Sequence, residues 1–453
     1  MKIWTTYSVR NSYLFPVTFV HFIRRICSSI AAWIFLTCGL FSQSQQSPNL
    51  LFILTDQHRQ DGVGAYGGTE VKTPHLDRMA SEGIRFNRAY TAQPVCAPNR
   101  AAIMSGLYPH NSGVLENTWD MDTNVRILSD ILGEHGYQTG YFGKWHLGDS
   151  ARDAWDEMPI YPNDGRGRRH YYEVDGEMVY QTEVITSDVI NFMTSRKDQP
   201  FYAFTSYYPP HPPYSVPEDY EAMYANLYPD DEERRKYYAM CTAVDDAVGL
   251  LLDSLEAQGI SDNTLVVMTS EHGHHFEHRW NDHAKRLCYD ISANIPMLMR
   301  YPGTIPGGQV SEALISSVDL VQTMLNLLNL PPEEGLDGAN LGNQITQKTD
   351  KGRASLVMVN VPFIDKSSRP NQPEIDKGEE RCVIKGDWKL ILSTVRAPEL
   401  FNLANDPGEI QNLWAEEQDS KIAGELKQAL KHWGNRTNDP ITPKLLSSLE
   451  SSK

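Results

Sequence analysis

Short apolar runs alternate with longer stretches of helical periodicity along most of the chain. The apolar runs have no polar alternation, which is typical of strands buried on both faces. They lie at 49–55, 139–142, 201–206, 264–269 and 295–300. Stretches with apolar residues three and four positions apart, each followed by a glycine, predict helices at 74–82, 125–135 and 234–258. Strands separated by helices predict a mixed, mostly parallel sheet with helices on both faces.

The pattern changes over residues 344–380, where polar residues, Lys, Pro and Asn dominate. Beyond it, Arg381–Leu392 predicts a β-hairpin that turns near Gly386, and a last helix is expected over 419–433. We therefore expect a large α/β domain over 48–350, a small α+β subdomain with an antiparallel sheet over 351–440, and a tail over 441–453.

The N-terminal residues predict a signal peptide over 1–44. They contain Lys and Arg but no Asp or Glu, and the apolar stretch 30–41 is followed by small and polar residues. That stretch is shorter than the roughly 20 residues of a membrane helix, so no stable membrane span is expected after processing. We expect export to the periplasm or the medium. An uncleaved anchor helped by 13–23, or a lipid attached at Cys38, is the alternative.

Composition narrows the functional classes. The chain has 453 residues, with 58 acidic against 41 basic side chains and a net charge of −17. Such acidity argues against a nucleic-acid partner, because nucleic-acid binders carry a basic face. Six cysteines are too few for a disulfide-dense scaffold. A large acidic enzyme or binding protein remains.

One segment carries a specific chemical signal. Cys96, Pro98 and Arg100 are spaced as Cys-x-Pro-x-Arg, and Ser105-Gly106 follow. The apolar residues 101–104 predict a helix, which places Cys96 near a helix N-terminus, where the positive end of the dipole favours an anion.

This segment resembles the signature of the sulfatase family, within the alkaline-phosphatase-like superfamily. The resemblance implies an alkaline-phosphatase-like fold and oxidation of Cys96 to formylglycine by a maturation enzyme. In that family one hydroxyl of the hydrated aldehyde attacks sulfur, and the other later drives the release of sulfate. Arg100 would orient and charge-balance the modified residue.

Polar residues also follow two of the predicted strands. Asp56 and Gln57 follow the first strand, and Glu271 and His272 follow the strand at 264–269. Because ligands collect at the carboxyl ends of strands in open α/β sheets, these residues are expected to hold a divalent cation. Oxygen ligands favour Ca²⁺, with Mg²⁺ or Mn²⁺ as alternatives.

The resemblance implies that residue 96 is a further ligand of this cation. The sequence departs from the family at two ligands, since the family usually has Asp where Gln57 and Glu271 stand.

Further basic and histidine residues match the family. Lys144 and His146 lie two residues apart in the segment Gly143–Gly148, so on an extended backbone their side chains point to the same side. His211 stands between prolines that hold it on a rigid loop. The resemblance implies that Lys144 binds the sulfate, that His146 acts as a base, and that His211 protonates the leaving oxygen.

Lys285 resembles the family's second sulfate-binding lysine, with Arg286 as the alternative. Segments that resemble the sulfatase family extend from about residue 49 to 413.

The expected reaction is hydrolysis of a sulfate ester, R–O–SO₃⁻ + H₂O → R–OH + HSO₄⁻, on a sulfated poly- or oligosaccharide such as an algal glycan or glycosaminoglycan. Basic and aromatic side chains suit an anionic sugar, and the expected subsite walls are 166–172, Tyr207, Tyr208, Tyr214 and 274–279. Two alternatives stay open: a phosphonate monoester or phosphodiester hydrolase with the same site, and a non-catalytic glycan-binding protein.

Overall fold

The computed structural model describes residues 47–148, 152–161, 170–276, 285–362 and 378–451. The predicted signal peptide, residues 1–44, lies outside these ranges. Residues from Ser47 onward form one compact unit. Within the described ranges, no helix combines the length and the apolar character that crossing a membrane requires.

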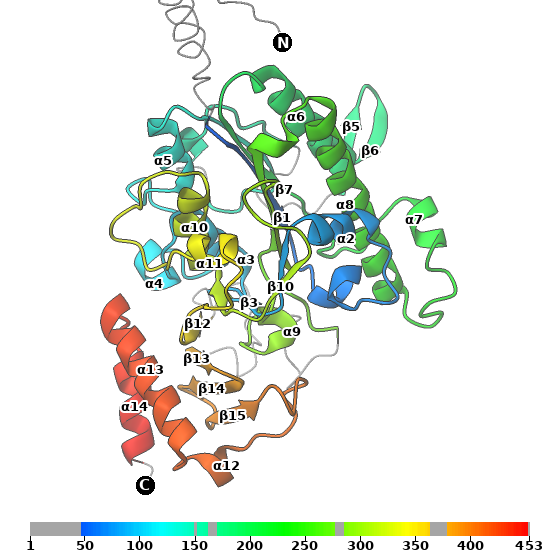
Figure 1. Cartoon of the computed structure of the whole chain (residues 1–453). Coiled ribbons are helices and arrows are strands. Elements are labelled where there is room, and N and C mark those ends of the chain that lie inside the picture. The colour runs from blue at the N-terminus through cyan, green and yellow to red at the C-terminus, as the bar shows by residue number, and fades with distance from the viewer. Residues whose placement is uncertain (1–46, 149–151, 162–169, 277–284, 363–377, 452–453) are drawn as a thin grey trace, which may run out of the picture. The chain divides into compact units, whose positions relative to one another are not determined.

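A seven-stranded sheet forms the centre of this unit (Figure 1). In spatial order its strands are β10 (Gln309–Ser311), β2 (Ile84–Phe86), β9 (Met297–Arg300), β8 (Thr264–Ser270), β1 (Asn49–Thr55), β7 (Phe201–Ser206) and β4 (Gln138–Gly143). Strands β8, β1, β7 and β4 are parallel, and β9 runs antiparallel to β8. The predicted mixed, mostly parallel sheet is confirmed.

Strand β1 shows why the apolar runs are continuous. Leu50, Phe52 and Leu54 belong to the core on one face of the sheet, and Leu51 and Ile53 belong to the core on the other. All five side chains are fully buried. A central strand with two covered faces has no solvent side and therefore no polar alternation.

Helices cover both faces of the sheet (Figure 1). One face carries α3 (Cys96–Ser105), α5 (Leu128–Glu134), α10 (Leu320–Leu327) and α11 (Gly342–Thr346). The other carries α2 (Pro74–Glu82), α6 (Gln181–Arg196) and α8 (Glu232–Ala257). Helix α5 begins later than predicted, because the Asp130 carboxylate accepts the N–H of Ile127 at 2.9 Å and caps the helix there.

Smaller elements complete this part of the chain. They are the helices α4 (Pro109–Ser112), α7 (Glu218–Ala222) and α9 (Asp290–Ala293), and the strand pairs β3 (Ala89–Tyr90) with β11 (Ile315–Ser316) and β5 (Tyr171–Val174) with β6 (Glu177–Tyr180).

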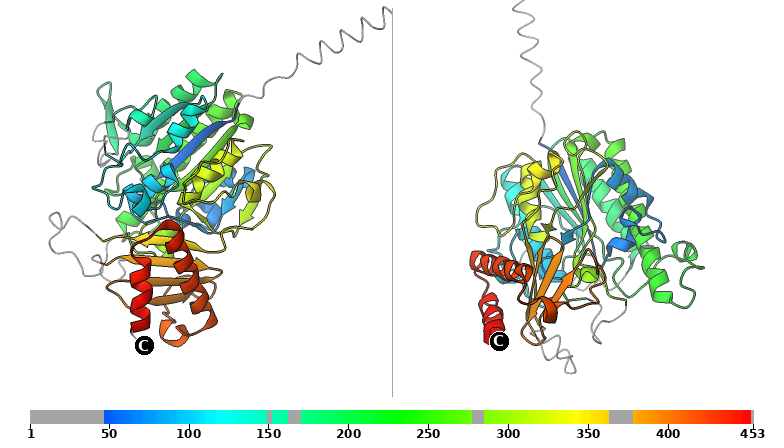
Figure 2. Two further views of the ribbon diagram at one scale, coloured as in Figure 1. Left: turned by 90° about the vertical axis from the view of Figure 1, so that its left-hand side faces the viewer. Right: turned by 60° about the horizontal axis from the view of Figure 1, so that its bottom comes forward.

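The C-terminal part contains the predicted antiparallel sheet (Figure 2). Its strands are β12 (Leu356–Asn360), β13 (Glu380–Lys385), β14 (Trp388–Ser393) and β15 (Glu399–Asn402), and its helices include α12 (Trp414–Glu417) and α13 (Lys421–Thr437). The hairpin turns at Gly386, whose φ of 56° is a conformation that glycine adopts without strain.

The predicted tail over 441–453 is wrong for most of its length. Residues Thr442–Ser451 form helix α14, and Leu445 is buried against Leu430 and Trp433 of α13. The Asp439 carboxylate accepts the N–H of Thr442 at 2.8 Å and caps the first turn.

Candidate active site

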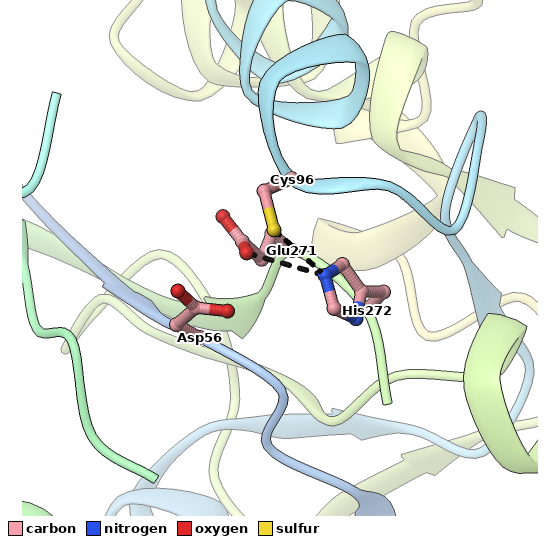
Figure 3. A group of neighbouring side chains, drawn as sticks. All are labelled: Asp56, Cys96, Glu271 and His272. Carbon is pink, nitrogen blue, oxygen red and sulfur yellow. Dashed lines mark hydrogen bonds and ion pairs between the residues drawn. The ribbon is translucent and has the colours of Figure 1, made fainter. Parts of the chain in front are cut away.

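The four parallel strands bring polar residues to one edge of the central sheet. Asp56 follows β1, Lys144 follows β4, Ser206 ends β7 and Glu271 follows β8. The register of the strands ends them side by side at that edge. Helix α3 begins at Cys96 and brings this residue to the same place (Figure 3).

The start of α3 is fixed by two asparagine side chains. The N–H of Ala97 donates to Oδ1 of Asn117 at 3.0 Å. The Asn99 side chain accepts the N–H of Ala92 at 2.9 Å and donates to the carbonyl of Glu271 at 2.6 Å. These bonds tie the first turn of α3 to the end of β8.

Cys96 is surrounded by positively charged side chains. Its Sγ is 2.8 Å from Nζ of Lys285 and 3.3 Å from Nε2 of His272, and the side chain is buried. Burial and the Glu271 carboxylate oppose ionisation, but Lys144, Lys285 and His272 outweigh them, so the pKa of the Cys96 thiol lies well below its usual range. A group at this position is stabilised when it is negative.

Four side chains form a group with the donor set of a cation site (Figure 3). One ligand atom from each of Asp56, Cys96, Glu271 and His272 lies within 4.8 Å of the others, and all four are buried. Nδ1 of His272 donates to the Gly273 carbonyl at 2.8 Å, so Nε2 is the nitrogen that faces the group. Burial and Lys285 oppose a charge on this imidazole, but Cys96 and Glu271 raise its pKa to about 9, so a cation bound here would replace the proton on Nε2.

The charges at this group also fit a cation. Burial and the nearby Glu271 carboxylate raise the pKa of Asp56 well above its usual range. Oδ1 of Asp56 and Oε1 of Gln57 are buried, and neither accepts a hydrogen bond from a described residue. A divalent cation between these oxygens would satisfy them and remove the repulsion between the carboxylates, so the residues fit such an ion.

Arg100 connects the elements that form the site. Its guanidinium pairs with the Glu271 carboxylate through Nε, and one terminal nitrogen donates to the Lys144 carbonyl at 2.7 Å, to Oγ of Ser206 at 2.7 Å and to the Tyr141 hydroxyl at 3.2 Å. The Arg100 side chain has no exposed surface. It therefore connects α3 with the ends of β4, β7 and β8.

Lys144 and its neighbours complete the cluster of charges. Its Nζ pairs with Asp56 and lies 3.7 Å from Oε1 of Glu271. Two residues further, His146 has a φ of 64°, an uncommon backbone conformation for a residue other than glycine. Burial and the Lys144 ammonium lower the pKa of His146, against the opposing electrostatic effect of the Cys96 side chain. Gln57 shares this left-handed conformation, with a φ of 62°.

His211 lies on the loop that follows β7. Its ring is tilted against Tyr208 at 4.7 Å between centroids, and its Nδ1 donates to the Pro212 carbonyl at 2.5 Å. Burial and the ammonium groups of Lys285 and Lys144 lower the pKa of His211 well below its usual value. The imidazole therefore shares the electrostatic field of the site.

The segment around Lys285 separates the two candidates for the second basic residue. Lys285 contacts Cys96, whereas Arg286 pairs with the buried Glu116 at 2.7 Å. Of the two side chains, the one that faces Cys96 is Lys285.

The residues expected to form the walls of a sugar subsite differ in their burial and contacts. Tyr207 is fully buried in the core and bonds to Thr186 at 2.6 Å, so its expected place in a subsite wall is wrong. Tyr208 lies under Lys144, whose Nζ is 5.1 Å from the ring centroid. The Tyr214 hydroxyl lies 3.2 Å from Nε2 of His274. Residues 166–169 and 277–279 lie outside the described residues.

Several residues that build the site were missed by sequence reasoning. Asn99, Ser206, Tyr141 and Glu116 act through the contacts given above, and the Tyr237 hydroxyl donates to the carbonyl of Gln57 at 2.9 Å. Ser206 could have been found, because it stands at the end of a predicted strand as Thr55 does before Asp56. The others have no local signal.

Comparisons with known proteins show which family this chain resembles. The family model named Sulfatase matches residues 48–330, and the model for the C-terminal part of N-sulphoglucosamine sulphohydrolase matches residues 276–436. An ulvan-active sulfatase of Formosa agariphila is 30% identical over 423 residues, which cover 84% of this chain and 80% of the relative. An N-acetylglucosamine-6-O-sulfatase of Bacteroides thetaiotaomicron is 24% identical, with 88% of each chain covered.

Solved structures share the fold. BT4656, solved in complex with its substrate D-glucosamine-2-N,6-O-disulfate, has a TM-score of 0.78 at 22% identity and covers 87% of this chain and 99% of its own. A phosphonate monoester hydrolase of Agrobacterium radiobacter has a TM-score of 0.72 at 23% identity, covering 86% and 96%.

Fold and site together define an alkaline-phosphatase-like hydrolase. The length and identity of the matches go further: the chain belongs to the sulfatase family, as a type I sulfatase, and its class of activity is sulfuric ester hydrolysis.

The contact between Arg100 and Ser206 gives a first prediction. Ser206→Ala leaves a buried guanidinium N–H with one acceptor fewer, so the free energy of unfolding should fall by about 1–3 kcal/mol, and kcat/KM for 4-nitrophenyl sulfate should fall about tenfold. Thr205→Val on the same strand is the matched control, because the Thr205 hydroxyl has no hydrogen-bond partner among the described residues. Equal activities of the two variants would contradict the assignment.

Proposed function

We propose that this enzyme hydrolyses sulfate esters of a glycan, with a formylglycine formed from Cys96 as the nucleophile. The observation that carries the proposal is the surroundings of Cys96, which begins a helix and lies beside Lys285, His272 and the carboxylates of the cation site. A sulfate group needs positive charge on several sides, and this position supplies it. Formylglycine, once formed, would supply a hydrated aldehyde whose hydroxyl attacks sulfur.

The residues around Cys96 have different roles in the reaction. Lys144 and Lys285 bind sulfate oxygens and stabilise the charge that moves onto them in the transition state. His146, which interacts electrostatically with the Cys96 side chain, accepts a proton from residue 96. Arg100 holds residue 96 against the strand ends.

His211 protonates the departing sugar oxygen. Its Nδ1 is bonded to the Pro212 carbonyl, so Nε2 is the nitrogen that exchanges the proton. The resting site disfavours the imidazolium because two ammonium groups are near. A bound sulfate monoester adds negative charge beside them and so favours the protonated imidazole that a general acid requires.

Asp56, Gln57, Glu271 and His272, together with residue 96, would hold the cation, and we propose Ca²⁺ because the donors are mainly hard oxygens. The cation would supply further positive charge against a sulfate oxygen. Glu271 in place of the family's Asp is compensated by its position, since its second carboxylate oxygen is bonded to Arg100.

The nature of residue 96 is tested by variants and mass spectrometry. Cys96→Ala should lower turnover of 4-nitrophenyl sulfate by about a thousandfold or more, because the nucleophile is removed. Peptide mass spectrometry of active enzyme should show the aldehyde at residue 96. Cys241→Ala is the control, since Cys241 is a buried cysteine of the α8 core. An unmodified Cys96 in fully active enzyme would refute this part of the proposal.

Removal of metal gives a second test. Stripping the enzyme with a chelator should lower both activity and the midpoint of thermal unfolding, and Ca²⁺ at about a hundred times its dissociation constant should restore about 2.7 kcal/mol of stability. Asp56→Asn should lose this response. Asp246→Asn should retain it, because Asp246 belongs to a separate group with His75 and Asp245. The opposite pattern would move the cation away from Cys96.

The proposal of a sulfated glycan is supported by the relatives, which are named for activity on ulvan or on a sulfated amino sugar. We expect a defined sulfated oligosaccharide, from a panel of ulvan, heparan and chondroitin fragments, to be hydrolysed with a higher kcat/KM than 4-nitrophenyl sulfate. Desulfated fragments are the control for binding. A phosphodiester or phosphonate monoester turned over faster than every sulfate ester would favour the alternative activity.

A further inference from the structure

The segment that carries Lys285 is anchored on one side by a buried ion pair. Arg286, which follows Lys285, pairs with Glu116 at 2.7 Å, and the two side chains are 3% and 1% exposed. Asn117, the neighbour of Glu116, accepts the N–H of Ala97 at the start of α3. This pair therefore helps to fix the position of Lys285 relative to Cys96.

On its other side the same segment lies against the C-terminal sheet. Residues 287–289 form a common core with side chains of β12, β13, β14 and β15, including Cys382, Ile391 and Phe401. The opposite face of that sheet packs on α13 and α14. The C-terminal sheet is thus sandwiched between its own helices and the segment that follows Lys285.

A fully buried lysine of β14 connects the two parts. Nζ of Lys389 donates to the carbonyl of Cys288 at 3.1 Å and pairs with the carboxylates of Asp290 and, at 2.7 Å, Glu409. Glu409 also accepts the N–H of Asp290 at 2.7 Å. The Tyr90 hydroxyl donates to the remaining oxygen of Asp290 at 3.1 Å. Both the backbone and the side chains of 288–290 are therefore held.

This arrangement favours a single geometry. Burial opposes the charge of Lys389, but Asp290 and Glu409 hold the pKa of its ammonium well above the usual range, so it is charged. A buried charge is tolerated only while all its partners are in place. Cys288 is three residues from Lys285, a separation of at most about 11 Å, so the position of Cys288 limits where Lys285 can lie.

We propose that Lys389 is a positioning residue for sulfate binding. By holding Cys288 and Asp290, it places the Lys285 ammonium beside residue 96, where the sulfate group is bound. The inference rests on the proposed sulfate-ester hydrolysis and extends it, because it gives the C-terminal subdomain a part in forming the anion site.

The test uses the full-length, Ca²⁺-loaded enzyme and measures binding of inorganic sulfate by calorimetry. Lys389→Met should weaken sulfate binding about tenfold and raise KM for 4-nitrophenyl sulfate about tenfold, and kcat should also fall because Lys285 stabilises charge in the transition state. Glu409→Gln keeps an acceptor for the N–H of Asp290 and is the milder variant, for which we expect both effects at about threefold.

Arg381→Met is the matched control. Arg381 is a buried residue of the same sheet that pairs with Asp439, with Nε 3.0 Å from Oδ2, and these contacts lie away from 285–290. Its variant should lower the thermal midpoint as Lys389→Met does, yet leave sulfate affinity and KM unchanged. An unchanged thermal midpoint together with weakened sulfate binding in Glu409→Gln would further separate positioning from global stability.

Three results would overturn the inference: unchanged sulfate affinity in both the Lys389 and Glu409 variants, an equal loss of affinity in Arg381→Met, or no sulfate binding by the wild-type enzyme. Sulfate binding that depends on Lys389 in an enzyme that hydrolyses no sulfate ester would instead support the positioning and refute the proposed function.

Discussion

The pairing of Arg100 with Glu271 is the interaction on which the arrangement of the site depends. Arg100 lies one helical turn after Cys96 on α3, so its guanidinium extends from the same face of the helix. A guanidinium without exposed surface is stable only if carboxylate and carbonyl partners surround it. Those partners lie at the ends of three strands, so the contacts of this one side chain fix the position of residue 96 relative to the strand ends.

The charges gathered around Cys96 differ in sign from the chain as a whole. The net charge of −17 is spread over a surface where salt screens charges more than about 10 Å apart. Inside the site, Lys144 is buried and Lys285 is partly buried, and both lie within contact distance of their partners, so each charge acts more strongly than at the surface. The local sign therefore opposes the global sign, and the carboxylates of Asp56 and Glu271 serve to hold positive charge in place.

The parts of this structure that could be predicted are those with a local signal. An apolar run followed at once by polar residues located the strand ends before Asp56 and Glu271, and the apolar residues after Arg100 located α3. Ser206 has a local signal as the end of a predicted strand, but its contact with Arg100, like that of Asn99 with Glu271, could not be predicted, because each partner is more than a hundred residues away in the sequence. Helix α14 was missed because serines and Pro443 obscure its apolar face, although proline is acceptable in a first helical turn.

The predicted domain boundary near residue 350 marks a change of topology, from the mostly parallel sheet to the antiparallel one, but no break in packing. Both faces of the C-terminal sheet are covered, one by α13 and α14 and the other by residues 287–293 of the large domain. Successive side chains of β14 therefore point into two different cores. Lys389 is the polar exception on the face toward Lys285. An ammonium in an apolar layer is costly unless carboxylates and carbonyls pair with it, and one partner here is the Cys288 carbonyl, on the backbone that leads to Lys285. The antiparallel sheet is for this reason better understood as the second support of the active site than as a separate module.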